Sequence, residues 1–262
     1  MIRAGDRDQL ESQLRRFVGA NVRGTPAMSG QEVAEDLELL AGECSVLALQ
    51  EFRHRWYWSK LRKALQSGAN GSWRSYPGFL VGLARPTYAG QAIAWRSGMW
   101  RKLDKRRRRL HKGYKRISEP RQLRAVLLED RTSGLVAWFG TTHFVVRGDM
   151  LRDPDKRRGI MRGDLAAFDL FLDDLRHTGH PGAIQLDANL TPHSTAAWTP
   201  FLAILRRHGC TIHGVRGVEY LITWPGRTTW LAVATDFDVP ARELNTDHEA
   251  RGIAFRLATR RR

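Results

Sequence analysis

The chain has 262 residues, of which 42% are hydrophobic, so it can build a sizeable core and is not disordered throughout. Its two cysteines, Cys44 and Cys210, have no partners at metal-ligand spacing, which excludes a disulfide framework and a zinc site. The 43 Lys and Arg residues exceed the 27 Asp and Glu residues by 16. This charge favours a polyanionic partner, nucleic acid first and an anionic membrane surface second.

The N-terminal residues 1–15 mix acids with arginines and are predicted to form a charged extension, either a short helix or a tail. They contain no apolar core of signal-peptide length, and no stretch of the chain approaches the roughly 18 apolar residues of a membrane span. We therefore expect a soluble, cytoplasmic protein without a membrane span. No linker divides residues 16–258, so they are predicted to form a single domain, followed by a basic tail at 259–262.

Hydrophobic periodicity predicts strands interleaved with a few helices. The first part of the chain is predicted to contain the strand Phe17–Val22, the helix Gly30–Cys44 with Val33, Leu37 and Leu40 on one face, the strand Ser45–Gln50 and the helix Trp56–Gln66. Short strands are then predicted at Phe79–Leu83, Gln91–Trp95, Ala125–Glu129 and Gly134–Val146. The last part is predicted to contain the helices Met161–His177 and Thr195–His208 and the strands Pro181–Asp187, Val218–Thr223, Trp230–Ala234 and Gly252–Leu257. This order indicates an α+β layered sandwich.

The predicted strand Ser45–Gln50 is followed directly by the acid Glu51. Its apolar run is typical of a strand that is buried on both faces. A carboxylate at the end of such a strand has left the hydrophobic cover but is still held by rigid backbone, which is a good position for a metal ligand. For this stretch taken alone, a strand that simply ends in a polar turn is the preferred explanation.

A strongly basic segment, residues 101–116, lies as an insert between two predicted strands, and 10 of its 16 residues are Lys or Arg. One interpretation is a mobile, solvated loop. The other is an arm that contacts phosphates, in which case Arg106, Arg107, Arg108 and Arg109 would bind the substrate. Both interpretations remain open on the composition alone.

Polar residues recur at or near the ends of the predicted strands. They are Asn21, Glu51, His143, Asp187, Asn189, Glu219, Asp247 and His248. Each alone is common in turns, in surface pairs or as a buried residue with its hydrogen bonds satisfied, so no single one marks a catalytic site.

The order of these residues along the chain and the motifs around them are more specific evidence than any single residue. The motifs are N-V-R-G at 21–24, L-Q-E at 49–51, T-H-F at 142–144, D-A-N-L-T-P at 187–192, V-E-Y-L-I-T at 218–223 and T-D-H at 246–248. This series resembles the endonuclease/exonuclease/phosphatase superfamily, which has the deoxyribonuclease I-like fold. The resemblance covers about residues 16 to 258. It implies a four-layer α/β sandwich with two facing, mostly antiparallel sheets flanked by helices, and metal-dependent cleavage of a phosphate ester at one rim.

The resemblance implies Mg²⁺ (or Mn²⁺) as the cofactor. Glu51 would be the principal ligand, with Asn21 and Asp247 nearby. Magnesium takes oxygen ligands and keeps several waters, so one or two protein carboxylates suffice. Arg53 and Arg55 follow Glu51 closely and either line the phosphate site or form an ordinary basic turn; their position favours the first interpretation.

The resemblance also implies the catalytic roles. Asp187 would position or deprotonate the attacking water, and Asn189 would hold the phosphate. His248 would contact the scissile phosphate as a base or an electrostatic stabiliser, and Glu219 would orient it. His143 would stabilise the charge that develops at phosphorus or protonate the leaving oxygen.

Three positions differ from the family pattern. Leu186 stands where the family has Gly, and Glu219 stands where it has Asp. Tyr88-Ala-Gly precedes the strand Gln91–Trp95, where pancreatic deoxyribonuclease and its relatives have an additional acid. The last difference separates the chain from those relatives, while the first two are compatible with the same chemistry.

The leading interpretation is a Mg²⁺-dependent nuclease, with DNA ahead of RNA as the substrate. The motif set supports the reaction class, and the charge supports the substrate. One alternative is a phosphoesterase of the same fold that acts on a small or lipid phosphoester. The other is a catalytically inactive nucleic-acid-binding protein, for which the differences at Leu186 and Glu219 are the only support.

Overall fold

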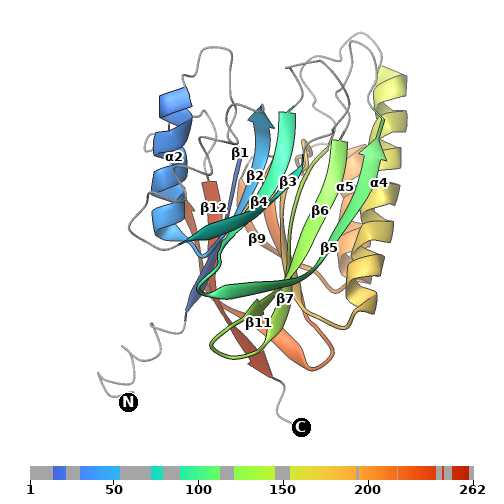
Figure 1. Ribbon diagram of the computed structural model, residues 1–262. Coiled ribbons are helices and arrows are strands. Elements are labelled where there is room, and N and C mark those ends of the chain that lie inside the picture. The colour runs from blue at the N-terminus through green and yellow to red at the C-terminus, as the bar shows by residue number, and fades with distance from the viewer. Residues whose placement is uncertain are drawn as a thin grey trace.

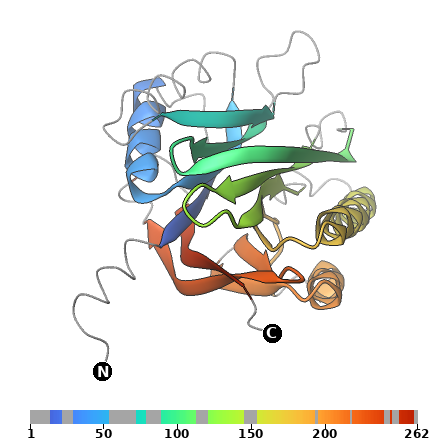
Figure 2. The ribbon, with the colours of Figure 1, turned by 60° about the horizontal axis from the view of Figure 1, so that its bottom comes forward.

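The chain folds into four layers. The computed structural model describes residues 14–21, 30–53, 72–78, 89–112, 121–144, 154–192, 195–216, 218–239, 244 and 250–259. Helix α2 (Gly30–Glu43) covers one sheet, and helices α4 (Pro154–His177) and α5 (Thr195–Arg207) cover the other (Figure 1). Figure 2 shows α2 on one side of the molecule and α4 and α5 together on the opposite side. The predicted four-layer sandwich is confirmed.

Each sheet has six described strands. Sheet A has the order β11 (Thr229–Val239), β12 (Ala250–Thr259), β1 (Arg15–Asn21), β2 (Val46–Arg53), β4 (Ala89–Arg96) and β3 (Trp73–Gly78). Sheet B has the order β5 (Trp100–His111), β6 (Arg121–Asp130), β7 (Val136–His143), β8 (Gly182–Asp187), β10 (Glu219–Trp224) and β9 (Thr211–Arg216). Only the pairs β1–β2 and β7–β8 are parallel among the described strands, so both sheets are mostly antiparallel, as predicted.

Apolar side chains fill the three spaces between the four layers. The space between the sheets is rich in aromatic rings, and Phe139 packs against Phe17, Trp100 and Phe255 with ring centroids 5.3, 5.3 and 5.7 Å away. A second cluster joins sheet A to α2, and a third joins sheet B to α4 and α5. Both faces of the central strands are covered, so their sequences are nearly continuous apolar runs. Such runs could be recognised as strands from the sequence.

The central strands and the helices that were predicted within the described residues are present in the structure. The helix predicted at Gly30–Cys44 is α2, with Leu37 and Leu40 buried, and the helices predicted at Met161–His177 and Thr195–His208 are α4 and α5. The elements predicted at Trp56–Gln66 and Phe79–Leu83 lie outside the described residues. Within the described part of the chain, no helix is long and apolar enough to cross a membrane.

The interpretation of the basic segment, residues 101–116, as a loop inserted between two strands is wrong for most of its length. Most of it is not a loop, because Trp100–His111 forms the 12-residue strand β5 at the edge of sheet B, and residues 113–116 lie outside the described residues. The strand pairs with β6 from Trp100 opposite Asp130 to His111 opposite Arg121. Charged side chains are compatible with this position because an edge strand faces solvent and arginine stems can lie along apolar surface.

Candidate active site

Four of the predicted site residues meet at one rim of the sandwich. Asn21 ends β1, His143 ends β7 and Asp187 ends β8. Glu219 begins β10, which runs antiparallel to β8, and it lies directly opposite Asp187. The topology therefore brings together polar side chains that are far apart in sequence, as the motif order predicted.

Asp187 is the centre of this cluster. Its side chain is 3% exposed, and Asn21 from the facing sheet donates a hydrogen bond from Nδ2 to Asp187 Oδ2 at 2.9 Å. The backbone N–H of Asn189 donates to Asp187 Oδ1 at 3.3 Å. Both carboxylate oxygens are thus oriented by N–H donors, one from each sheet.

The turn after Asp187 has a special backbone conformation. Asn189 has a φ of 50°, in the left-handed region that asparagine tolerates better than most residues. Its side chain donates from Nδ2 to the carbonyl of Phe144 at 3.3 Å, and Tyr220 donates from its hydroxyl to the carbonyl of Leu190 at 2.7 Å. Burial raises the pKa of Tyr220 to about 12, so this hydroxyl keeps its proton and its hydrogen bond. These bonds fix the D-A-N turn against its neighbours.

His143 is fully buried beside Asp187, with its Nε2 atom 3.4 Å from Asp187 Oδ2. On the other side of the ring, Arg121 Nη1 lies 3.0 Å from His143 Nδ1. A guanidinium group can only donate, so Nδ1 is the acceptor, and the neutral ring carries its proton on Nε2, toward Asp187. Arg121 belongs to none of the sequence motifs. It begins β6 and is brought to His143 by the pairing of β6 with β7.

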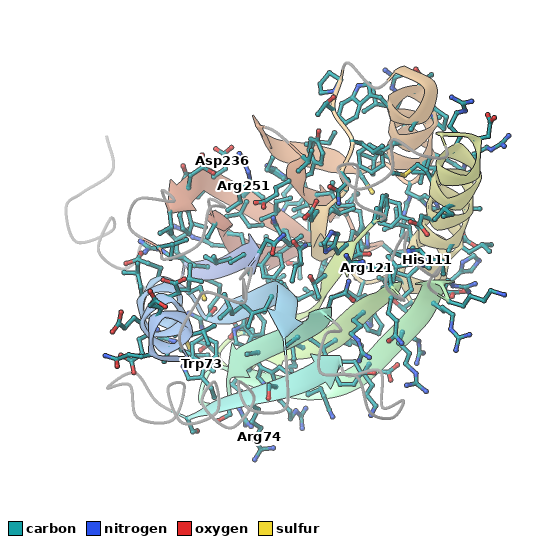
Figure 3. All side chains as sticks on the ribbon, turned by 90° about the horizontal axis from the view of Figure 1, so that it is seen from above. Trp73, Arg74, His111, Arg121, Asp236 and Arg251 are labelled. Atoms are coloured by element: carbon teal, nitrogen blue, oxygen red, sulfur yellow. The ribbon has the colours of Figure 1, made fainter. Side chains whose placement is uncertain are left out.

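A second buried histidine lies on the far side of Arg121. His111 ends β5 opposite Arg121 and lies on the α4 side of it, as Figure 3 shows from above the rim. Its Nε2 atom is 3.8 Å from a carboxylate oxygen of Asp164, a fully buried residue of α4. Burial, reinforced by the charge of Arg121, lowers the pKa of His111 to about 4. His111 is therefore neutral near pH 7, and the Arg121 charge lies between two neutral imidazoles.

Polar contacts also join the two sheets next to this cluster. Gln50 of β2 donates from Nε2 to the carbonyls of Thr142 and Gln185 in sheet B at 2.8 and 3.2 Å. Gly19 of β1 lies so close to Gln185 that a Cβ atom there would come within 2.0 Å of its side chain. The close approach of β1 to β8 thus requires glycine at this position.

Some predicted site residues are not tested by this geometry. Glu51 and Arg53 lie within β2, but their side chains are outside the described part of the structure, as are the whole of Arg55, Asp247 and His248. Their roles, and that of Glu219 as the partner of His248, stay predictions. Arg106, Arg107, Arg108 and Arg109 lie along β5, on the edge of sheet B rather than at the centre of the rim.

The donor chemistry at the rim suits a hard divalent cation. Asn21 and Asp187 supply amide and carboxylate oxygens, which are the ligand types that Mg²⁺ prefers. Among the described side chains, no three His, Cys, Asp or Glu residues lie close enough together to hold a metal ion by themselves. A magnesium site here would therefore need Glu51 or Asp247, the two carboxylates predicted for it.

The remaining chemistry-bearing features have structural explanations. Burial raises the pKa of both Cys44 and Cys210 to about 12, so neither thiol is a thiolate nucleophile near pH 7. Leu186, which replaces the family glycine, is fully buried in the cluster between sheet B and its helices. Because neighbouring strand residues point to opposite faces, Leu186 packs in the core while Asp187 reaches the rim.

The architecture is thus a four-layer α/β sandwich in which the polar ends of several strands gather at one rim. Compared by sequence, the chain matches no protein-family model and none of the curated proteins. Compared by structure, it is similar to an endonuclease/exonuclease/phosphatase from Bacteroides vulgatus, with a TM-score of 0.67 and 14% identity over 94% of this chain and 99% of that chain.

Two further solved structures share the fold. The human Nocturnin catalytic domain with bound sulfate has a TM-score of 0.65 and 14% identity, over 94% of this chain and 95% of that chain. The D. rerio TDP2 complexed with single strand DNA product has a TM-score of 0.66 and 13% identity, over 92% of this chain and 98% of that chain. The superfamily fold predicted from the six motifs is therefore confirmed.

Proposed function

We propose that the protein is a divalent-metal-dependent phosphodiesterase and that its substrate is nucleic acid, DNA ahead of RNA. The observation that carries the proposal is the cluster of Asn21, His143 and Asp187, which the two sheets bring together at one buried rim. The net charge of +16 supports a polyanionic substrate. In this proposal residues 16–258 form one catalytic domain, flanked by the charged extension 1–15 and the basic tail 259–262.

Each residue of the cluster has a role that its contacts support. Asp187, oriented by Asn21 and by the backbone of Asn189, would hold or deprotonate the attacking water. His143, with its proton on Nε2, would donate to the charge that develops on the phosphoryl oxygens or to the leaving oxygen. The direction in which the described hydrogen bonds orient the two side chains supports both roles.

The remaining roles rest on the motifs. Asn189 would contact the phosphate, His248 would stabilise it or act as a base, and Glu219 would orient His248. Glu51, Asn21 and Asp247 would hold Mg²⁺ or Mn²⁺, and the bound cation would neutralise charge on the phosphate during displacement. Arg53 and Arg55 would line the same site from the end of β2 and the residues after it.

A product ladder tests this proposal. End-labelled single-stranded DNA, duplex DNA and RNA are incubated with the protein in Mg²⁺ and, as the control, in EDTA. We expect Mg²⁺-dependent cleavage with the highest rate on DNA, and the ladder distinguishes internal cuts from removal of terminal nucleotides. Cleavage that persists in EDTA would overturn the metal dependence.

The same assay separates the alternatives because solved structures of this fold include enzymes with other substrates. They include a mannosyl-6-phosphatase of Bacteroides thetaiotaomicron and ANGEL2, a 2',3'-cyclic phosphatase. Turnover of a sugar phosphate, an inositol phosphate or sphingomyelin, with none on any nucleic acid, would identify a small-molecule or lipid phosphoesterase. Tight DNA binding without turnover of any phosphoester would identify an inactive binding protein.

A further inference from the structure

The edge strands of the two sheets lie on the same side of the sandwich. Strand β3 is the edge of sheet A, and β5 is the edge of sheet B. They are close enough for the Lys105 ammonium to lie 5.1 Å from the centroid of the Tyr76 ring. The seam between β3 and β5 is therefore lined by side chains from both sheets.

Strand pairing divides the charges of β5 into two rows. The outer row is Asp104, Arg106 and Arg108, which lie opposite Leu127, Ala125 and Leu123 of the cluster between sheet B and its helices. The inner row is Lys102, Lys105, Arg107 and Arg109, which lie opposite Leu128, Val126, Arg124 and Gln122. Leu128 and Val126 belong to the cluster between the sheets, so the inner row faces sheet A.

The outer row is engaged within the protein. Arg106 pairs with Asp104 at 2.8 Å and lies over Trp138, with 5.9 Å from its guanidinium carbon to the ring centroid. Arg108 pairs with Asp174 of α4 at 2.5 Å. The Arg108 pair attaches the edge of sheet B to its covering helix α4.

The inner row is different. None of its four cations has a carboxylate partner among the residues that the structure describes, and all four are exposed. The Lys105 ammonium and the guanidinium carbon of buried Arg124 both lie over the Tyr76 ring, each 5.1 Å from its centroid. A row of exposed, uncompensated like charges that faces one seam favours an anionic ligand.

A groove of about 580 Å³ continues this row at the end of β5 that is remote from the catalytic rim. Its lining includes four cations, Arg74, Arg101, Lys102 and Arg131, and the largely buried rings of Trp95 and Trp100. The described residues that line it include no carboxylate. Arg101 is paired with Glu129, whereas Arg74 is exposed and points away from the body of the fold in Figure 3.

We propose that the groove and the inner row form a track that binds one strand of nucleic acid and leads it along β5 to the catalytic rim. The proposal takes its ligand class from the function proposed above. From Lys102 to Arg109 the track is roughly 24 Å long, at the usual rise of a strand. Packed sheets are about 10 Å apart, so the charged seam along their two edges is narrow and suits one strand lying along it better than a duplex.

Another explanation of basic edge strands is that they prevent sheets from pairing edge to edge. That role needs charge on the edge but makes no distinction between the inner and outer rows. The track makes such a distinction, and β5 supplies a matched control because Arg107 and Arg109 alternate with Arg106 and Arg108.

The experiment compares two double variants that each remove two charges from β5: Arg107→Ser with Arg109→Ser, and Arg106→Ser with Arg108→Ser. The affinity for a labelled oligodeoxythymidylate of about 16 nucleotides is measured in EDTA across a salt series. Loss of the inner pair should lower the salt slope by about 1.4, the value for two phosphate contacts on a single strand. Loss of the outer pair should change the slope by less than half as much.

The groove is tested with a third variant, Arg74→Ser with Lys102→Ser, which should weaken binding of the same strand and also lower the slope. Thermal unfolding of all three variants shows that each remains folded. Equal slopes for the inner and outer pairs would overturn the track. A larger loss for a duplex of the same length, or for phosphatidylserine vesicles, would overturn the assignment of a single strand.

Turnover of a small phosphodiester by the wild-type protein with Mg²⁺ is measured separately. If that turnover is absent while the inner and outer pairs still differ in DNA binding, the proposed reaction fails and the track stands. If turnover is present while the pairs bind DNA equally, the reaction stands and the track fails.

Discussion

Arg121 donates a hydrogen bond from Nη1 to Nδ1 of His143 at 3.0 Å, and this contact fixes which nitrogen of the neutral imidazole carries the proton. With Nδ1 accepting, Nε2 must be the donor, and it lies 3.4 Å from Asp187. A protonated ring would present N–H groups at both nitrogens and turn one of them toward the guanidinium. Arg121 therefore keeps His143 in the form that can donate at the rim but cannot accept there.

Removing the donor of Arg121 should reduce turnover without removing any group that touches the substrate. We expect Arg121→Met to lower kcat by roughly 10- to 100-fold, the usual cost of losing the partner that orients a functional histidine. Arg121→Gln retains an N–H donor and should recover part of the loss. Ring ¹⁵N NMR of His143 in the wild type and both variants measures the tautomer directly.

The NMR spectrum distinguishes orientation from general stability. Arg121→Met should shift the proton of His143 away from Nε2 or produce a mixture of tautomers. If kcat falls while the tautomer and the melting temperature stay as in the wild type, the role assigned to Arg121 is wrong.

Replacing Glu51 should abolish turnover while the fold stays intact. Glu51→Gln keeps the size of the side chain and removes the charge that would hold the metal. Calorimetric titration with Mn²⁺ should show weakened binding, and the thermal unfolding profile in EDTA should match that of the wild type. Near-wild-type turnover at low Mg²⁺ would show that Glu51 is not the metal ligand.

His143 and Asp187 should act as one unit. We expect His143→Gln and Asp187→Asn each to cost about two orders of magnitude in kcat, the scale of one acid–base or charge-stabilising group. The double variant should lose much less than the product of the two losses, because both side chains serve the same phosphate. Losses that multiply would indicate independent roles.

Glu219→Asp should be tolerated better than Glu219→Ala. Glu219 lies opposite Asp187 at the rim and is 6% exposed, so a carboxylate there is close to the reacting groups. A shorter acid can still reach a histidine partner through a small shift or a water, whereas alanine cannot. The ratio of the two kcat values measures this, and equal, negligible effects would make Glu219 an ordinary strand residue.

His111 should make the protein less stable in mild acid. Its pKa is about 4 in the folded protein and 6.5 when unperturbed, so between these values the unfolded chain binds more protons than the folded one. The free energy of unfolding should therefore fall as the pH drops from about 7 to about 4, by at most about 3 kcal/mol from this residue. His111→Gln should make the pH dependence shallower in urea unfolding experiments.

The control for this prediction is His177, at the C-terminal end of α4, where the side chain is exposed. His177→Gln is measured alongside as the substitution of an exposed histidine by the same residue. Among the described residues, Arg121 of β6 and Asp164 of α4 face His111, and the His111 variant retains both. A pH dependence equal to that of the wild type in His111→Gln would mean that burial does not keep this histidine neutral.

The central strands and the helices could be predicted because burial on both faces leaves a continuous apolar run. The strands that the sequence did not reveal, β3, β5 and β9, are all at sheet edges. Both faces of β5 carry charged side chains, so the strand has no alternation of apolar and polar residues. Strand β3 contains Pro77 and Gly78, which normally indicate a turn but are tolerated where one side of the strand is unpaired. An edge strand needs apolar cover on little of its surface, so hydrophobic periodicity does not identify it.

Some residues of the candidate site could likewise be predicted from the sequence, and others could not. Asn21, His143, Asp187 and Glu219 could be placed at one rim because each occurs in a motif at a strand end. Arg121 could not, because its contact with His143 depends on the pairing of β6 with β7, and no local pattern sets that pairing. The division of β5 into inner and outer rows also depends on the position of its bulges, which follow Lys102 and Arg109.

The hydrogen bonds of Gln50 and Asn21 have a consequence for the whole sandwich. Apolar packing between two sheets tolerates sliding, since it has no preferred direction, whereas a hydrogen bond is satisfied at only one alignment. Gln50 and Asn21 both belong to sheet A and both donate to sheet B at the rim. These hydrogen bonds fix the alignment of the two sheets at the rim, where the two halves of the candidate site meet. The relative position of the site residues therefore does not depend on how tightly the aromatic interior is packed.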